Sequence, residues 1–267
     1  MDNMEKLVRQ RRSVRTFDGR ELTAEDKEKL FNYIASMDNP YGLPIEFKLL
    51  PKMGCPVVVG TDLYIGAKMK DAPHLNEAFG YAFEKLVLYA QSLGIGTVWI
   101  GGTMDRSAFE KAMELSDDEV MPCVSPLGYP AKKMSVREKM MRKGVKADIR
   151  LSFEEIAFWN DFHHSLSADA AGKLFLPIET VRLAPSAVNK QPWRIVVIDD
   201  IVHFYLQRSK NSSGGRIDMQ KIDMGIALCH FELTAKEQGI STEFVIKEPN
   251  ISLEDGMEYI ASYKFKI

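Results

Sequence analysis

The chain carries an internal sequence duplication, and this repeat is the feature that most constrains its fold. Residues 22–31 (LTAEDKEKLF) match residues 166–175 (LSADAAGKLF), and residues 80–97 (GYAFEKLVLYAQSLGIGT) match residues 225–242 (GIALCHFELTAKEQGIST). The offsets of the two matches are 144 and 145 residues, so they agree with each other. Coincidence between amphipathic helices is the alternative, and it gives no reason for similar offsets. We therefore predict two similar lobes in one chain.

Each repeat reads as two helices followed by a strand, a helix and a strand. Thr23 and Ser167 are typical N-caps, and Gly94 and Gly239 stand where helices are expected to end. Residues 77–93 are apolar almost all round, so this helix should be buried. The predicted fold class is α+β, an internally duplicated pseudo-dimer with mixed or antiparallel sheets and buried central helices. The expected strands are Pro56–Val59, Thr97–Ile100, Arg194–Asp199, Val202–Gln207, Thr242–Lys247 and Tyr259–Ile267.

Composition excludes several classes of protein. The formal net charge of -2 gives no global reason to expect a nucleic-acid partner. Cys55, Cys123 and Cys229 are an odd number without a CxxC pair, which favours reduced thiols over disulfides or a zinc site. The N-terminus lacks the apolar run of a signal peptide, and no segment is apolar enough to span a membrane. We expect a cytoplasmic protein that binds no metal, nucleic acid or membrane.

The segment between the repeats differs from both. Residues 131–150 contain eight Lys or Arg residues against Glu138 and Asp148. This segment is either a solvated basic linker or one that partly returns to an anionic ligand. We divide the chain into lobe 1 at residues 1–125, a basic crossover at 126–159 and lobe 2 at 160–267, which together form one binding unit.

Three short motifs carry hydrogen-bonding groups that could hold a ligand. Arg9 to Phe17 (RQRRSVRTF) places guanidinium groups and a hydroxyl on one face if it is extended, which suits a phosphate monoester. Thr97 to Asp105 (TVWIGGTMD) puts two glycines directly after an apolar strand, where the backbone can approach a flat ligand. Leu183 to Trp193 (LAPSAVNKQPW) offers donors and acceptors in a loop bounded by prolines. The alternatives are an exposed basic turn, a strand-to-helix turn capped by Asp105, and a plain connection.

Together these motifs resemble the FMN-dependent nitroreductase superfamily. The resemblance touches most of the chain. It is carried by four segments: RRSVRTF, APSAVNKQPW, the helix that ends LGIGTVWIGG, and SPLGYP. The order resembles the group with two fused lobes, because the arginine motif lies in half one and the APSxxNxQPW motif in half two. The resemblance implies a nitroreductase-like fold with one FMN per chain, held by both lobes. Whether the chain is a monomer or a homodimer stays open.

The resemblance also implies roles for individual residues. Arg11, beside Arg12, would hold the phosphate with Ser13, and Arg15 would lie near the N1–C2 edge of the ring. Lobe 1 would add backbone from Ile100, Gly101, Gly102, Leu127 and Gly128, with the Gly101 N–H donating to N5. Lobe 2 would add Pro185, Ser186, Asn189 and Gln191, and Arg150 would close on the phosphate. The family's lysine two places before Arg150 is Asp148 here, and Lys146 or Lys132 are the suggested substitutes.

The implied activity is reduction of a nitroaromatic, a quinone or a similar small acceptor. NADH or NADPH would deliver hydride to the flavin in a ping-pong cycle, and no protein side chain is expected to act as the catalyst. Two alternatives remain open: other flavin chemistry on the same scaffold, such as a dehalogenase or enoate reductase reaction, and FMN binding without turnover.

Overall fold

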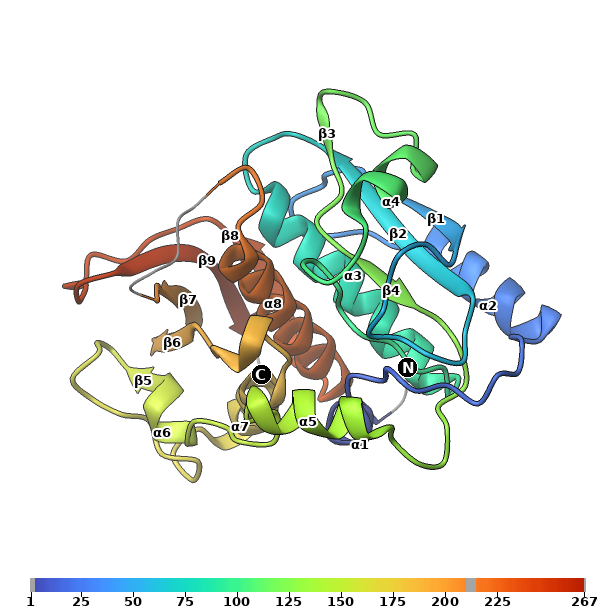
Figure 1. Ribbon diagram of the computed structural model, residues 1–267. Helices are drawn as coiled ribbons and strands as arrows, with labels where there is room; N and C mark the ends of the chain where they lie inside the picture. The colour runs from blue at the N-terminus through green and yellow to red at the C-terminus, as the bar shows by residue number, and fades with distance from the viewer. Residues whose placement is uncertain (1–2, 210–214, 267) are drawn as a thin grey trace. The chain divides into compact units, whose positions relative to one another are not determined.

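The computed structural model describes residues 3–209 and 215–266, which fall into two compact units (Figure 1). Unit 1 comprises Gln10–Ala147, and unit 2 comprises Asp2–Arg9 with Asp148–Ile267. The division into two lobes and a crossover, drawn from the sequence, stays a prediction.

Unit 1 is an antiparallel sheet with helices packed on it. β1 (Glu46–Pro51) pairs with β2 (Leu63–Lys70), and β2 pairs in turn with β3 (Glu119–Val120) and β4 (Val124–Pro126). The central helix α3 contacts β2, and α2 packs on α3. Most of α3 is buried, as its apolar sequence predicts. The helices of this unit are α2 (Ala24–Ala35), α3 (Leu75–Ser92), α4 (Arg106–Ala112) and α5 (Val136–Gly144).

Unit 2 is a mixed sheet of order β5-β6-β7-β9-β8. β5 and β6 are parallel, and the other pairs are antiparallel. The buried helix α8 packs on α7 and contacts β6, β7 and β8. The strands are β5 (Ala157–Trp159), β6 (Trp193–Ile198), β7 (Ile201–Gln207), β8 (Ser241–Val245) and β9 (Met257–Lys266). The α-helices are α1 (Met4–Gln10), α6 (Phe153–Ile156), α7 (Phe175–Leu183) and α8 (Met219–Glu237), with 3-10 turns at Gly172–Leu174 and Ala187–Asn189.

The two units repeat one plan, which confirms the predicted α+β class. In each unit an antiparallel strand pair precedes a long buried helix, β1-β2 before α3 and β6-β7 before α8. Helix α3 begins at Leu75 and α8 at Met219, which is the spacing of the sequence matches. Gly94 and Gly239, at φ 75° and 71°, adopt the left-handed conformation expected after these helices.

Several predicted elements differ from those observed. Pro56–Val59 and Thr97–Ile100 are not strands, because their backbones pair only through isolated bridges such as Thr16 with Val59. The real strands of unit 1, β1 and β2, were missed, since β1 ends in proline and β2 contains a glycine and two lysines. Thr23 caps α2 as predicted, with its hydroxyl accepting from Asp26 N–H. Ser167 caps only a turn, with its hydroxyl accepting from Ala170 N–H. A helix does not continue from this turn, because Gly172 has a left-handed backbone conformation at φ 53°, and α7 begins later, at Phe175.

Candidate flavin site

The arginine motif in unit 1 is an extended segment next to residues 97–100. Ser13 forms a parallel bridge with Thr97, and Val14 N–H donates to Thr97 O at 2.9 Å. On the other side Val59 N–H donates to Arg15 O at 3.0 Å. Val14 is buried in the core cluster, whereas Ser13 and Arg15 are only half-buried. The alternation expected of an extended segment is therefore present.

Arg11 and Arg15 have hydrogen-bonding capacity that the described residues leave unused. The Nε atom of each is buried, and within residues 3–209 and 215–266 neither atom has a hydrogen-bond partner. Burial lowers the pKa of both guanidinium groups, while Glu84 raises that of Arg11 and Glu138 raises that of Arg15. Glu84 is fully buried on α3 and accepts the Trp99 indole N–H at 2.9 Å. A buried, incompletely paired guanidinium is costly unless an anion completes its contacts.

Arg12 has a different position from its neighbours in the motif. Its Nη1 atom is 2.8 Å from Glu138 Oε1, in an ion pair whose carboxylate is fully buried. The other oxygen of Glu138 accepts the Thr16 hydroxyl at 2.7 Å and the Arg15 N–H at 3.3 Å. The Arg12 guanidinium therefore stabilises the packing of α5 on the motif.

The glycine turn, Gly101 and Gly102, follows Ile100. Ile100 N–H donates to Val124 O at 2.9 Å, and Val124 N–H donates to Ile100 O at 3.0 Å. The Arg106 side chain fixes the turn by hydrogen bonds to backbone carbonyl groups: Nη2 donates to Gly101 O and Nη1 donates to Met121 O, both at 2.7 Å. In the described part of the chain, the N–H groups of Gly101 and Gly102 have no backbone acceptor. The turn thus keeps two donors available.

The predicted contacts from SPLGYP lie on the neighbouring segment. Gly96 N–H donates to Gly128 O at 2.8 Å, and Leu127 N–H donates to Leu63 O at 2.9 Å. A side chain at Gly128 would start 2.8 Å from the ring of Phe17, so only glycine fits against the motif. Unit 1 therefore brings the arginine motif and the 96–100 segment together with Leu127 and Gly128.

In unit 2 the APSAVNKQPW loop is a strained 3-10 turn fixed by its own polar groups. Ser186 Oγ accepts Gln191 N–H at 2.9 Å. Val188, Asn189 and Gln191 all have positive φ angles, of 44°, 58° and 51°. This conformation is unfavourable for a β-branched residue such as Val188, and such strain is concentrated at ligand-binding loops. Half-buried Pro185 precedes the turn.

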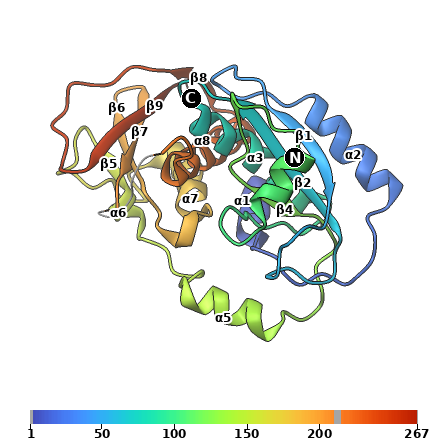
Figure 2. The same cartoon turned by 45° about the horizontal axis from the view of Figure 1, so that its top comes forward.

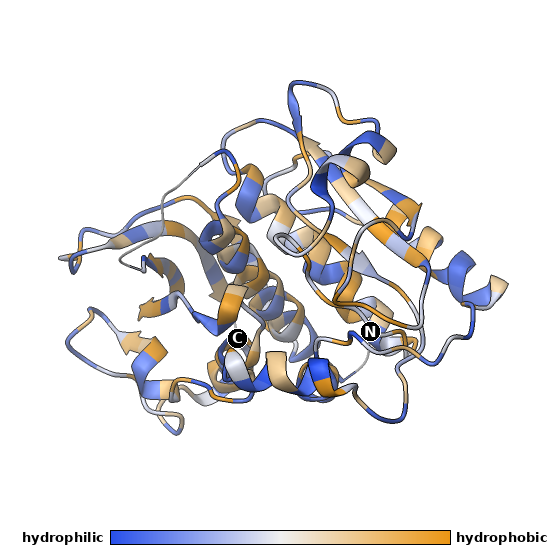
Figure 3. Ribbon diagram, viewed as in Figure 1, coloured by the Kyte–Doolittle hydropathy of each residue, from blue (hydrophilic) through white to orange (hydrophobic). Residues whose placement is uncertain are grey.

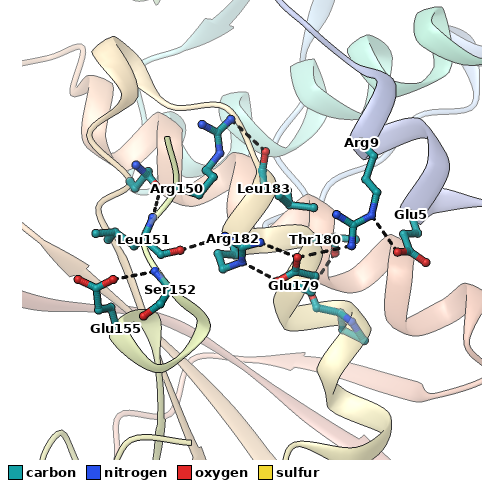
Figure 4. A network of polar contacts seen from close by, with 12 residues as sticks. Glu5, Arg9, Arg150, Leu151, Ser152, Glu155, Glu179, Thr180, Arg182 and Leu183 are labelled. Atoms are coloured by element: carbon teal, nitrogen blue, oxygen red, sulfur yellow. Dashed lines mark hydrogen bonds and ion pairs between the residues drawn. The ribbon is translucent and has the colours of Figure 1, made fainter. Parts of the chain in front are cut away.

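The loop is also tied to residues 149–151. Arg150 donates to Asn189 Oδ1 at 3.1 Å and to Leu183 O at 3.4 Å, as Figure 4 shows for the second contact. Asn189 Nδ2 donates to Ile149 O at 2.9 Å, and Gln191 Oε1 accepts Leu151 N–H at 2.9 Å. Unit 2 therefore gathers Arg150, Ser186, Asn189 and Gln191, and these residues bond to one another and to nearby backbone.

Sequence reasoning missed three buried acids that support these segments. Glu84 lies near Arg11, Glu138 near Arg12 and Arg15, and Asp223 beneath the loop, where both its oxygens lie 2.9 and 3.1 Å from Ala187 N. The available signal was a single acidic residue in an apolar helix, as at Glu84. Burial raises the pKa of Asp223 well above its ordinary value.

The fold defined by these elements is nitroreductase-like. A Thermotoga maritima protein described as a putative nitroreductase matches at a TM-score of 0.60 and 21% identity, over 98% of this chain and 92% of its own. The chain belongs to the family described as "Putative TM nitroreductase", whose model matches residues 3–235. It is therefore a nitroreductase-family oxidoreductase.

Other solved structures are similar to about half of the chain. A Clostridium novyi nitroreductase family protein has a TM-score of 0.44 and 15% identity, over 51% of this chain and 90% of its own. An "FMN-dependent Nitroreductase" of Clostridium difficile has a TM-score of 0.41 and 18% identity, over 51% and 94%. No curated protein matches the chain. Among the described residues, no helix is long and apolar enough to cross a membrane.

Proposed function

We propose that the chain binds FMN and uses NADH or NADPH to reduce nitroaromatic, quinone or similar small acceptors. The observation that carries this proposal concerns the guanidinium groups of Arg11 and Arg15, whose buried Nε atoms have no hydrogen-bond partner in the described residues. Family membership and the motif resemblance support FMN as the anion that completes them.

The residues of unit 1 fit a flavin mononucleotide. Arg11 and Ser13 are assigned to the phosphate, and Arg15 to the electron-rich edge of the ring. Gly101 and Gly102 offer backbone N–H donors, and Ile100, Leu127 and Gly128 belong to adjoining segments. When bound, FMN supplies hydride transfer between the nicotinamide donor and the acceptor.

The chain's own residues bind, orient and balance charge. Burial lowers the pKa of both Arg11 and Arg15, and the nearby carboxylates of Glu84 and Glu138 respectively oppose this shift. Arg106 fixes the glycine turn through the carbonyl of Gly101 and leaves the N–H groups of the turn to donate. Pro185, Ser186, Asn189, Gln191 and Arg150 are assigned to the same cofactor, and this part rests on the motif resemblance. Their intramolecular bonds keep the loop in one conformation before binding, which lowers the ordering cost.

Flavin binding is the first test. The purified protein should carry, or take up on incubation with FMN, the flavin absorbance bands at one FMN per chain. It should then oxidise NADH or NADPH in the presence of a quinone or a nitroaromatic. A colourless protein that gains no flavin absorbance would overturn the proposal, and FMN binding without NAD(P)H turnover would leave a binding protein.

Two variants test the assigned residues. Arg11→Met should weaken FMN binding by about 10- to 100-fold, the loss expected for one charge-assisted hydrogen bond. Lys70→Met, on the exposed end of β2, is the matched control and should bind FMN normally. The double variant Ser186→Ala, Asn189→Ala should reduce FMN retention while the far-UV circular dichroism stays native. Unchanged retention would make that loop a structural turn only.

A further inference from the structure

Unit 1 contains an open cleft that shares only Leu127 with the residues assigned to the flavin. The volume of the cleft is about 620 Å³, which is within the range of small-molecule sites. It lies between the segment before α2, the end of β1 and the start of β2. The lining consists of residues 19–22, Lys27, Lys52, residues 60–63 and Leu127.

Two glycine-containing turns meet at one end of this cleft. Gly19 and Gly60 have left-handed backbone conformations, at φ 87° and 84°, and Gly19 N–H donates to Gly60 O at 3.1 Å. A side chain at Gly60 would begin 2.2 Å from Phe17 O, so only glycine lets the two turns meet. The Thr61 hydroxyl donates to Leu127 O at 2.6 Å. These contacts fix the lining before any ligand binds, which lowers the ordering cost of binding.

The cleft adjoins an apolar crevice between α2 and the sheet of unit 1. Figure 2 shows α2 beside β1 and β2, and Figure 3 shows that α2 carries both hydrophilic and hydrophobic residues. The crevice and the cleft share Leu22, Lys27, Leu63 and Leu127. The crevice has a volume of about 10 Å³, enough for about one water molecule. The three shared leucines therefore form an apolar wall, with little space behind it.

Lys27 is the cation at the junction of the cleft and the crevice. The charged residues of the cleft lining are Arg20, Glu21, Lys27, Lys52 and Asp62. Asp62 lies 3.6 Å from Lys52, and Asp18 lies 2.7 Å from Arg20. Lys27 is half-buried, and within residues 3–209 and 215–266 it forms no ion pair. A half-buried cation without a carboxylate beside it favours an anion.

We propose that this cleft binds a small amphipathic anion, a carboxylate or sulfonate carried on an apolar chain or ring. The apolar part of the ligand lies against Leu22, Leu63 and Leu127, and Lys27 pairs with its anionic group. Glu21 is exposed, so solvent screens its charge. The site is built by unit 1 and does not depend on the proposed FMN chemistry.

Octanoate is the probe, because it combines a carboxylate with a short apolar chain. Isothermal titration calorimetry gives its Kd for the protein with and without saturating FMN. Hexanoate should bind about tenfold more weakly, because two fewer methylene groups contact the leucines. Octylammonium has the same chain with the opposite charge and should also bind about tenfold more weakly. FMN should change the Kd of octanoate by less than about twofold, as for two sites without coupling.

Variants on α2 test the role of the cation. Lys27→Met should raise the Kd of octanoate about tenfold and remove the preference for octanoate over octylammonium. Lys27→Arg keeps the charge and should bind octanoate within about threefold of wild type. Lys29→Met removes an exposed cation of the same helix that lies outside the cleft lining, and this matched control should bind octanoate as wild type does.

Each contrary result overturns a different part of the proposal. Without saturable octanoate binding, the cleft is not a ligand site. Equal affinities for octanoate and octylammonium would contradict recognition of an anion. Equal losses in Lys27→Met and Lys29→Met would trace binding to the general charge of α2, and competition between octanoate and FMN would place octanoate in the flavin site. If the protein does not bind FMN, the proposed function fails, while the titrations with octanoate alone still test the cleft.

Discussion

At the scale of single residues, Asp223 shows how a buried acid holds a strained loop. Its side chain is 2% exposed on α8, and the Ala187 N–H donates to it at the start of the turn that contains Val188 and Asn189. Burial is the main cause of its raised pKa, the hydrogen bond from Ala187 opposes this shift, and Asp218 adds to it. The carboxyl group therefore does two things: it accepts a hydrogen bond, and it destabilises the fold when it ionises.

These two effects separate in a pair of variants. Because the pKa is raised in the folded state, the stabilising contribution of Asp223 is complete below the unfolded pKa and is lost as pH rises through the folded pKa. Asp223→Asn keeps an acceptor for Ala187 but cannot ionise, so its stability relative to wild type should increase from pH 4.5 to pH 8. Asp223→Ala leaves the Ala187 N–H unpaired and should cost about 1–3 kcal/mol at pH 4.5. Urea unfolding at both pH values measures the free energy of unfolding of each protein. If the difference between wild type and Asp223→Asn does not change with pH, the raised pKa of Asp223 in the folded state is contradicted.

At the scale of elements, local signals in the sequence predicted some features and long-range contacts decided the others. β6, β7, β8 and β9 were predicted within a few residues, because apolar or alternating runs bounded by turns are local signals. The alternation of Arg11, Ser13 and Arg15 was also readable. The role of α5 was not, because its only signal was a basic composition, and what places it is a contact between Glu138 and residues more than a hundred positions earlier.

That contact predicts how α5 responds to mutation. Glu138→Ala removes the acceptor of Arg12, Thr16 and the Arg15 N–H, and should destabilise the protein by roughly 2–4 kcal/mol, as for breaking a buried ion pair. Amide hydrogen exchange should accelerate across Val136–Gly144 more than in α3 or α8. The control Lys139→Ala, at the exposed neighbouring position, should leave exchange and stability as in wild type. Equal exchange in α5 of the two variants would show that Glu138 does not anchor the helix.

At the scale of the whole molecule, the two halves kept one architecture and diverged in their polar residues. Where half two has the loop with Ser186 and Asn189, half one has SMDNPYGLPIEF, and its Asn39 only forms a turn by accepting the N–H groups of Tyr41 and Leu43. The sequence therefore predicted the duplication, the arginine motif of half one and the APSxxNxQPW motif of half two. It could not predict the supporting acids, because their partners are set by tertiary packing.

Stability against acid should depend on the second half of the chain. His203 is 2% exposed in β7, with Nδ1 2.7 Å from Ser262 Oγ, and Tyr259 OH lies 2.7 Å from the same hydroxyl. Burial, with a smaller contribution from Lys247, lowers its pKa from 6.5 to about 4. The unfolded chain therefore binds a proton that the folded chain does not, so the contribution of His203 is present above pH 6.5 and is lost as pH falls toward 4.

The loss should amount to roughly 2–4 kcal/mol between these pH values, since each unit of pKa difference corresponds to about 1.4 kcal/mol. His203→Asn keeps a polar side chain toward Ser262 but has no proton to gain. The free energy of unfolding of wild type should therefore fall more steeply than that of the variant between pH 7 and pH 4, while Asp223 changes both proteins equally and cancels in the difference. Urea titrations at half-unit pH steps give this slope directly. Parallel curves would mean that the imidazole has the same pKa in the folded and the unfolded chain, and that some other group controls acid unfolding.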